Sequence, residues 1–459
     1  MNVEAVREPP GPPGPLVRNL LTALRDPLAF LQDLQSLYGD VVTLRKGKTY
    51  LVAHPDGIKH VLQDNHLNYQ KGPRYRAALK PLMGAGLLTA DGDAWKRQRH
   101  LAQPAFLKKH HEQFAAAMVR HLLSVRAEWL QVAERGEPLD LHQQMARTSL
   151  SIMLRMIFGE HAGEQTVELA RAFLAAEREI DIVSVFNPVP LPEWIPTPSR
   201  YRFKKAVREV DTFVLNSIRA RRASGQESND LLGMYLSARE EGTGSGLDDQ
   251  LLRDEMITLL SAGHETLADS IAWAFHLLLT HPAEYQRVSA EIDRVLGGRL
   301  PELDDLPSLE LVARTIHEAL RLYPPGWGFL RTALAPDVIG GYPIPAGARI
   351  VISPYLTQRL SSLWEDPNRF DPDRFLPEAS ANRHRFAWFP FSGGPRMCIG
   401  SGFAMLEAQL ILAVLLQAFH IELRPGQNIR PLPRVSLKPS GPIWVHLSTR
   451  SAPAGVSLK

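Results

Sequence analysis

This 459-residue chain contains a single cysteine, Cys398, and that count limits both how the fold can be stabilised and what chemistry it can carry. One thiol cannot form an internal disulfide, a Cys-x-x-Cys redox pair or an iron–sulfur cluster, because each of these needs further sulfur atoms. Three uses of the thiol remain: an inert buried side chain, a nucleophile, or a single-thiolate metal ligand. On the count alone the inert use is favoured, since free cysteine packs well as a small hydrophobic residue.

The residues around Cys398 favour the metal ligand instead. Glycines on both sides let the backbone turn tightly and approach a flat group closely. From Ile399 to Leu416 the sequence is apolar on nearly all sides, which predicts a buried helix. Cys398 would lie at the N-terminus of this helix, where the helix dipole stabilises a thiolate. Arg396 supplies a permanent positive charge for a carboxylate, so this loop suits haem iron and the haem propionates.

The segment 391–400, Phe-Ser-Gly-Gly-Pro-Arg-Met-Cys-Ile-Gly, resembles the haem-binding signature of the cytochrome P450 family. The defining positions of that pattern are occupied by Phe391, Gly394, Arg396, Cys398 and Gly400. The pattern is specific, and three further motifs follow in the family's order over most of the chain. The resemblance implies haem b (iron protoporphyrin IX) as the cofactor, with Cys398 as the axial ligand of the iron.

The first further motif is Glu318-Ala-Leu-Arg321. Residues three apart share a face of a helix, so these two side chains can form an ion pair. Such pairs usually lie on the surface and contribute about 0–1 kcal/mol. Apolar neighbours indicate that this pair is buried, in which case its remaining polar atoms need partners. Arg374 resembles the third member of the family's Glu–Arg–Arg network, and we expect a structural role for all three residues.

The second motif, Ala262-Gly-His-Glu-Thr266, lies within a long apolar segment from about Leu251 to Thr280. Ala262 and Thr266 share a helix face, and Gly263 would let a flat group pack closely. A threonine within a helix can bond the carbonyl four residues earlier and bend the helix, which opens space for water or dioxygen. The alternative is that Thr266 only satisfies itself in this way and that Glu265 is a solvated acid. The resemblance implies a catalytic pair in which Thr266 hydrogen-bonds dioxygen and Glu265 relays protons.

The third motif is Trp95-Lys-Arg-Gln-Arg99. Trp and Arg four apart lie on one helix face, so the indole N–H and the guanidinium could bind one propionate. Alone, this spacing more often gives surface Trp–Arg stacking. Arg331 resembles the family's additional propionate-binding arginine, on the strand after the Glu318 helix. The resemblance implies that the two haem carboxylates form charge-assisted hydrogen bonds with Trp95 and three arginines, Arg99, Arg331 and Arg396.

Expectations about the substrate pocket follow from family position alone. The resemblance implies an apolar pocket on the distal side of the haem, formed by segments 75–88, 326–330 and 435–437 together with Ala262. Within these segments the expected pocket residues are Leu87, Leu88, Trp327, Phe329 and Leu437. The proline-rich segment 187–198 is too broken for a helix and is expected to be a mobile lid loop over the substrate channel.

Long helical periodicity from about residue 93 to 300, and again after 398, predicts a mostly α-helical fold. Strand-like segments at 40–54 and 328–353 predict small β-sheets. The expected fold class is therefore α+β, the cytochrome P450 fold in a single haem-containing unit. The expected division is a proline-rich segment at 1–15, a catalytic domain at 16–447 and a C-terminal tail at 448–459. Residues 16–31 are expected to form at most one amphipathic surface helix.

Composition bears on membrane attachment, on location in the cell and on nucleic-acid binding. No segment reaches the roughly 18 uninterrupted apolar residues that a membrane-spanning helix needs, so we expect no integral membrane anchor. The first 15 residues lack the apolar core of a signal peptide, and we expect a cytoplasmic enzyme. A net charge of +3 gives no case for nucleic-acid binding.

The resemblance implies a monooxygenase that inserts one oxygen atom from O2 into an apolar substrate such as a fatty acid or terpenoid. The chain has no Gly-x-Gly-x-x-Gly fingerprint, flavin domain or cluster cysteines, so electrons should come from a separate ferredoxin or flavodoxin with an NAD(P)H-dependent reductase. Candidate docking charges are Lys96, Arg97, Lys108 and Lys109, and a monomer is expected. Two alternatives stay open. One is a peroxide-driven haem-thiolate peroxygenase, although such relatives typically lack the Glu–Thr pair; the other is a non-catalytic haem-thiolate sensor or binding protein.

Overall fold

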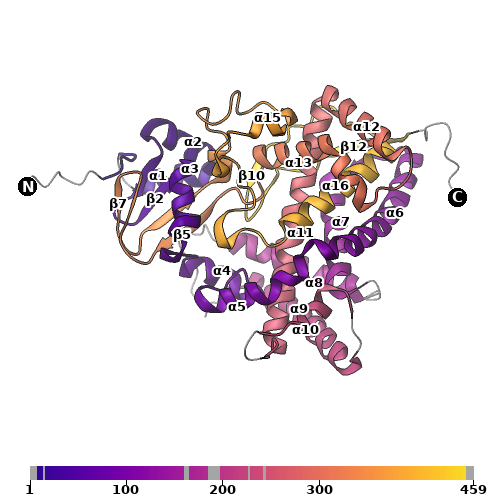
Figure 1. The fold of residues 1–459 in the computed structure, drawn as a ribbon, viewed down its shortest axis with the longest axis horizontal. Coiled ribbons are helices and arrows are strands. Elements are labelled where there is room, and N and C mark those ends of the chain that lie inside the picture. Colours follow the sequence, from indigo (N-terminus) through magenta and orange to yellow (C-terminus); the bar gives the residue numbers. More distant parts are fainter. Residues whose placement is uncertain are drawn as a thin grey trace, which may run out of the picture.

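The computed structural model describes residues 8–13, 16–159, 165–183, 197–225, 228–240 and 244–450. Long helices form the main body of the molecule, and a five-stranded sheet packs at one end, on the left in Figure 1. The expected fold class, mostly α with small β-sheets, is confirmed.

The helices range from single turns to one that crosses the whole core. The α-helices are α1 (Leu16–Arg25), α2 (Pro27–Tyr38), α3 (Pro55–Lys59), α4 (Pro73–Met83), α5 (Gly92–Ala102), α6 (His111–Arg135), α7 (Leu141–Phe158), α8 (Gln165–Val183), α9 (Pro198–Ser224), α10 (Leu231–Ser237), α11 (Asp249–Thr280), α12 (Pro282–Leu296), α13 (Glu310–Leu322), α14 (Pro354–Thr357), α15 (Pro377–Ser380) and α16 (Ser401–Ala418).

The strands are short, and three pairs of described strands join segments that are distant in the sequence. The strands are β1 (Val41–Arg45), β2 (Thr49–Val52), β3 (Tyr69–Gln70), β4 (Leu139–Asp140), β5 (Phe329–Ala333), β6 (Asp337–Ile339), β7 (Tyr342–Ile344), β8 (Arg349–Ile352), β9 (Phe419–Leu423), β10 (Pro431–Pro433), β11 (Leu437–Pro439) and β12 (Trp444–Thr449). The five-stranded sheet has the order β1-β2-β8-β5-β3, in which only β2 and β8 are parallel. Strands β4, β12 and β9 form a second sheet, and β6–β7 and β10–β11 are hairpins.

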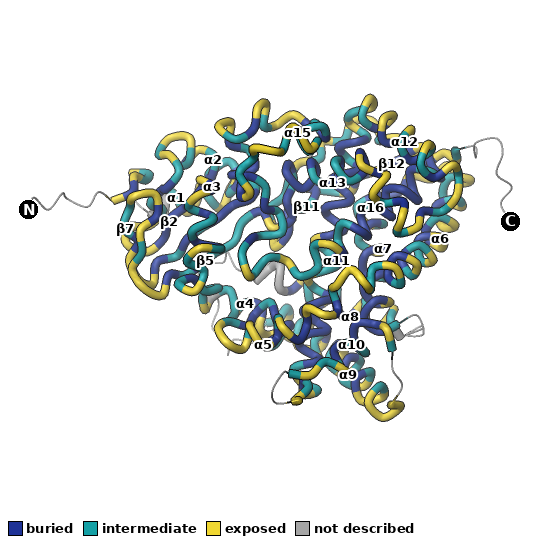
Figure 2. Tube along the Cα trace, viewed as in Figure 1, coloured by how far each residue is buried: buried dark blue, intermediate teal, exposed yellow. Residues whose placement is uncertain are grey.

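Helices α11 and α16 form the centre of the core, where the tube in Figure 2 is mostly buried. The side chain of Asp248 caps α11 by accepting a hydrogen bond from the Leu251 N–H at 2.8 Å. Pro282, which follows the C-cap residue of α11, cannot continue that helix. Helices α7 and α13 pack against α11, while α6 packs against α16. The core therefore brings the motif-bearing helices close to the loop that precedes α16.

Within the described residues, α16 is the one helix that is long and apolar enough to cross a membrane. Yet 67% of it is buried inside the fold. A core helix passes such a test of length and composition as readily as a spanning one. Its apolar surface is accounted for by packing within the protein.

The hairpin β10–β11 is fastened to α11. The indole Nε1 of Trp273 on α11 donates a hydrogen bond to the carbonyl oxygen of Leu437 at 2.8 Å. The N–H of Leu437 donates to the carbonyl of Pro325 at 3.0 Å. Trp273 also stacks on Tyr323, with ring centroids 3.9 Å apart. These contacts fix the backbone of β11 against the middle of the long helix.

Three expectations about the elements need comment. The single helix expected at residues 16–31 was wrong: Asp26 and Pro27 break it into α1 and α2, and Leu31 is one of three buried leucines on α2. Helix after residue 398 extends only to Ala418, and four strands follow it. The strand segments near 40–54 and 328–353 are confirmed. The expected lid loop at 187–198 lies almost entirely outside the described residues.

Candidate haem site

The loop before α16 is built to present Cys398. Gly394 has a φ of +66°, and a Cβ there would lie only 1.9 Å from the carbonyl oxygen of Leu62, so this position requires glycine. The N–H of Cys398 donates to the Phe391 carbonyl at 2.9 Å, which closes the loop. The cysteine precedes the helix N-cap, Gly400, by two residues.

Cys398 is exposed, yet the surrounding protein still removes much of its hydration. This desolvation raises the pKa of the thiol, although the Gly400 N–H and the charge of Arg99 act in the opposite direction. The Gly400 N–H thus acts in the direction expected of a helix N-terminus, but desolvation outweighs it in this state. A coordinated metal ion deprotonates a thiol directly, so the raised pKa does not oppose iron ligation.

Arg99 connects α5 to the cysteine loop. Its Nη1 donates to the carbonyl oxygen of Met397, the residue before Cys398, at 2.9 Å. Burial lowers the pKa of Arg99, while Cys398 and Tyr235 raise it. The structure thus places Arg99 beside the cysteine and does not show it in the group formed by the other two expected arginines.

Arg396 and Trp95 are in direct contact. The Arg396 guanidinium lies over the Trp95 ring, 4.3 Å from its centroid. Its Nη1 donates to the Ala90 carbonyl at 3.1 Å, and its Nη2 forms a salt bridge with Asp91. Trp95 therefore contacts Arg396 through its ring face, whereas the sequence reasoning paired its N–H with Arg99.

A third cation, Lys71, joins Arg331 and Arg396, and the sequence reasoning missed it. Its Nζ donates to the Leu88 carbonyl at 2.7 Å. Burial, reinforced by Arg331 and Arg396, lowers the pKa of Lys71 to about 7. Burial and Arg396 also lower the pKa of Arg331 to about 10. Nothing in the sequence marked Lys71 except its position just before the segment expected to face the pocket.

These residues fit a haem. Arg331 and Arg396 carry buried or partly buried positive charges, and Lys71 adds a third when it is protonated; within the described chain Asp91 is the one acid that acts on all three. An excess of buried positive charge is costly unless anions compensate for it. Two haem carboxylates would supply that compensation, beside a loop that presents one sulfur atom.

Helix α11 has an open face in its otherwise buried middle. Ala262 and Thr266 are both exposed, one helical turn apart. The Thr266 hydroxyl donates to the Ala262 carbonyl at 2.7 Å, so the alternative in which Thr266 satisfies itself describes this state. Gly263 faces Met153 of α7, because a Cβ there would lie 2.8 Å from that side chain. The expectation that Gly263 admits a flat group was therefore wrong, since this glycine lets two helices pack closely.

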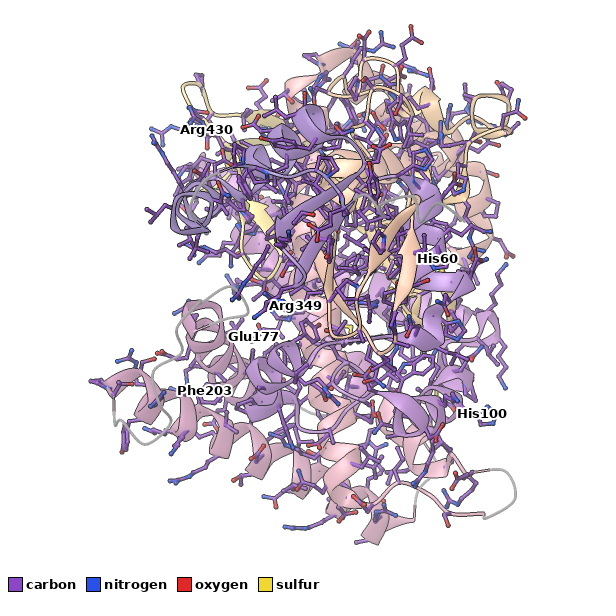
Figure 3. The ribbon with its side chains drawn as sticks, turned by 90° about the vertical axis from the view of Figure 1, so that its left-hand side faces the viewer. His60, His100, Glu177, Phe203, Arg349 and Arg430 are labelled. Carbon is purple, nitrogen blue, oxygen red and sulfur yellow. The ribbon has the colours of Figure 1, made fainter. Side chains whose placement is uncertain are left out.

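Glu265 forms an ion pair, which excludes the reading that it is only a solvated acid. Its Oε1 lies 3.0 Å from the Nζ of Lys438 on β11. On the opposite side of α11, the buried His264 contacts Glu177 of α8 at 3.2 Å, and Glu177 also accepts from the Ser261 hydroxyl. Glu177 is labelled in Figure 3.

The structure brings Glu318, Arg321 and Arg374 together. Arg321 donates to both carboxylate oxygens of Glu318, at 2.6 and 2.7 Å, and both side chains are fully buried. The Nε of Arg374 lies 3.5 Å from the same carboxylate. Arg321 also donates to the carbonyls of Gln358, Pro367 and Arg369, so its donors are satisfied.

The expected pocket residues separate into two groups. Leu88 and Phe329 are partly exposed, as residues that line a pocket should be. Trp327 and Leu437 are buried together in an apolar cluster beneath the five-stranded sheet, and the Trp327 Nε1 donates to the Arg434 carbonyl. The structure does not place these two on a pocket wall; they are core residues. Leu87 is likewise buried, in the main helical core.

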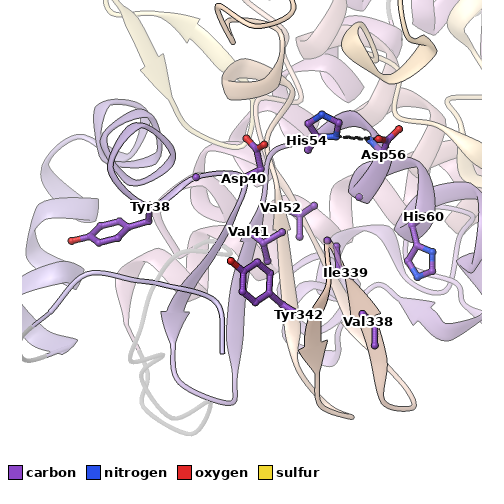
Figure 4. A pocket seen from close by; sticks show the side chains of 13 residues that line it. Tyr38, Asp40, Val41, Val52, His54, Asp56, His60, Val338, Ile339 and Tyr342 are labelled. Carbon is purple, nitrogen blue, oxygen red and sulfur yellow. Dashed lines mark hydrogen bonds and ion pairs between the residues drawn. The ribbon is translucent and has the colours of Figure 1, made fainter. Parts of the chain in front are cut away.

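Two of the surface hollows in the described part of the chain can be compared with the expected site residues. One, of about 470 Å³, lies between β1, β2, α3 and the β6–β7 hairpin, and none of the expected site residues lines it (Figure 4). The other, of about 420 Å³, lies against the outer side of the cysteine loop. Its walls include Phe391, Met397, Gly402 and Arg385.

Comparison with known proteins agrees with this arrangement. The family model described as Cytochrome P450 matches residues 9–446. The chain is 35% identical over 432 residues to cyclooctatin synthase of Streptomyces melanosporofaciens, covering 94% of this chain and 93% of that protein. It is 35% identical over 425 residues to pentalenene oxygenase of Streptomyces avermitilis, covering 91% and 92%. The crystal structure of the cytochrome P450DA heme domain superposes with a TM-score of 0.89 at 26% identity, covering 99% of this chain and 100% of that one.

Proposed function

This chain belongs to the cytochrome P450 family and is a haem-thiolate monooxygenase, and we propose that it oxygenates terpenoids with electrons from a separate ferredoxin or flavodoxin. Pentalenene oxygenase, among its relatives, supports a substrate of this class. When bound, the haem activates dioxygen, and its thiolate ligand favours cleavage of the O–O bond. The remaining work of binding, orientation and proton supply falls to the protein.

The single observation in the structure that carries the proposed oxygenation chemistry is the open face of α11. Thr266 and Glu265 lie side by side on a helix whose other residues are mostly buried. We propose that the Thr266 hydroxyl turns from the Ala262 carbonyl to a reacting oxygen, and that Glu265 moves protons to it from the surface. Lys438 holds the Glu265 carboxyl in place at the start of that path.

We also propose roles for the residues that would bind the haem and face the substrate. Cys398 would ligate the iron, while Arg331 and Arg396 would bind the haem carboxylates beside Lys71. Trp95 would support Arg396 through its ring, and Arg99 would hold the cysteine loop. Leu88, Phe329 and Ala262 would face the substrate, as exposed or partly exposed residues from three different segments.

We propose that the electron donor docks over the hollow outside the cysteine loop. Gly402, on its wall, lies close to His111 at the start of α6, and the exposed Lys108 and Lys109 precede that helix. The other two expected docking charges are already paired, Lys96 with Asp93 and Arg97 with Glu240. An acidic ferredoxin or flavodoxin would complement Lys108 and Lys109, which form no ion pair within the described residues. We further propose a monomeric, cytoplasmic enzyme.

To test this function, the full-length holoenzyme is incubated with candidate terpenes, ferredoxin, reductase, NAD(P)H and isotopically labelled O2. One labelled oxygen atom should enter the product, and the other should leave as water, with two electrons and two protons consumed. Product formed with hydrogen peroxide but not with the reductase system would indicate a peroxygenase. No product under either condition, over a broad panel, would leave a sensor or binding protein.

Thr266→Ala should lower the yield of product per NAD(P)H severalfold while leaving haem content unchanged, because the proton-delivering hydroxyl is lost. Thr280→Ala is the matched control, since the Thr280 hydroxyl makes the same bond to a carbonyl four residues back, at 2.8 Å, near the end of α11. Product and NAD(P)H consumption are measured together. Equal yields for both variants would return Thr266 to a purely structural role.

A further inference from the structure

We propose that Asp91 is a positioning residue that holds Arg396 over Trp95 and acts as the internal counter-ion of the cations around the haem carboxylates. The inference rests on the haem site described above and deepens it. Asp91 lies directly before α5, outside every motif that the sequence reasoning used.

The first support is the direction of the Asp91 side chain. Asp91 is the N-cap residue of α5, a position where aspartate normally accepts hydrogen bonds from the first free N–H groups of the helix. No such bond is present here. The carboxylate turns instead toward Arg396 and forms a salt bridge with its Nη2. The side chain therefore contributes to the ion pair at the expense of capping its own helix.

The second support is burial. Only 5% of the Asp91 side chain and 14% of the Arg396 side chain are exposed, so solvent screens this pair weakly. The adjacent Ala90 carbonyl accepts the other terminal nitrogen of Arg396. Ala90 and Asp91 thus bind the two terminal nitrogens of the Arg396 guanidinium, and the Trp95 ring packs against its face. These three contacts together orient the guanidinium.

The third support is the charge balance. Asp91 raises the pKa of Lys71 and Arg331 against the lowering caused by burial. Its second oxygen, Oδ2, is buried, makes no hydrogen bond within the described residues, and lies 3.8 Å from the Nε of Arg76. The Asp91 carboxylate is therefore the shared negative charge of four basic side chains, those of Lys71, Arg76, Arg331 and Arg396.

A consequence for the bound haem follows from Coulomb's law. Reduction adds an electron to the cofactor, and nearby positive charge favours the reduced state. Removing the negative charge of Asp91 while retaining the cations makes the surroundings more positive. The midpoint potential of the haem should then rise, without any change in the axial ligand.

The experiment compares Asp91→Asn with Asp93→Asn in the full-length holoenzyme. Asp93 lies two residues after Asp91, in the first turn of α5, and its side chain is 97% exposed and pairs only with Lys96 among the described residues. Asp93→Asn is therefore the same chemical change as Asp91→Asn, made at an exposed carboxylate. The readout is a spectroelectrochemical titration of the haem midpoint potential. Asp91→Asn should shift the potential upward, whereas Asp93→Asn should leave it at the wild-type value.

Two further variants keep the proposal testable. Asp91→Glu retains the charge and should stay closer to wild type than Asp91→Asn; equal shifts in both would show that shape matters and would overturn the proposal. Arg76→Gln removes a partly exposed cation beside Oδ2 and should shift the potential downward by a smaller amount. If Asp91→Asn does not retain haem, the midpoint potential of Arg76→Gln becomes the deciding measurement. An unchanged or raised potential in Arg76→Gln would then overturn the proposal. The reduced carbon monoxide spectrum of each variant is recorded first, so that loss of thiolate ligation is recognised separately.

Discussion

Buried glutamates are present in the core, where charged side chains are rare. Glu255 on α11 and Glu407 on α16 are buried, and burial raises the pKa of both. The pKa of Glu255 reaches about 8, with a smaller contribution from the negative charge of Asp254. Tyr235 and Arg99, from α10 and α5, lie near enough to interact with one another electrostatically, and Tyr235 also interacts with Glu255. Sequence patterns gave no sign of this cluster, because a single acid in a long helix resembles any surface acid.

The raised pKa of Glu255 predicts a specific dependence of stability on pH. Between its usual value of 4.5 and about 8, the folded protein holds a proton that the unfolded chain has lost. The free energy of unfolding should therefore fall as pH rises through this window, by up to about 1.4 kcal/mol per pH unit. Glu255→Gln should remove this loss, so that its advantage over wild type grows with pH in denaturant unfolding. Exposed Glu128 provides the control, since Glu128→Gln should run parallel to wild type at every pH; a parallel course for Glu255→Gln would contradict the account.

At the scale of elements, the long helices and the strands near 40–54 and 328–353 were predictable, whereas the strands elsewhere in the chain were not. The pattern of α11 and α16 is apolar on nearly all sides, and such a run has few alternatives to a buried helix. Strand β4 has only two residues and exists because Trp444 and Val445 of β12 lie beside it. Its pairing joins segments about three hundred residues apart, which no local pattern encodes. Trp327 and Leu437 were misplaced for the same reason, since only the tertiary fold shows which cluster covers them.

The Glu318–Arg321 pair on α13 is a fully buried ion pair, with 0% of either side chain exposed. Arg321 joins α13 to the segment 358–369 through three backbone carbonyls as well as Glu318. Arg321→Met would leave the Glu318 carboxylate buried without its main partner, so we expect a loss of about 3–5 kcal/mol in the free energy of unfolding. Arg294→Met, at an exposed site near the end of α12, should cost far less. Equal losses in denaturant unfolding would show that burial of the pair does not matter.

For the whole molecule, the motifs indicated the fold because they are spread along the chain and meet at one place. Residues near 95, 265, 320 and 398 come from α5, α11, α13 and the loop before α16, and the helical core assembles these elements. The cysteine loop and the Glu–Arg–Arg contacts were predictable, since each is specified by a few neighbouring residues. Lys71, Asp91 and Lys438 were not, because their importance depends on charges brought close only by folding. The division at residues 16 and 447 stays a prediction.

The central claim is that this fold holds a haem through the thiolate of Cys398. The absorption spectrum of the purified full-length protein, reduced and exposed to carbon monoxide, tests it most directly. The account predicts the strongly red-shifted Soret band of a thiolate-ligated ferrous haem, and predicts that Cys398→Ala lacks it. A protein without haem, or a band at the position typical of histidine ligation, would contradict the account.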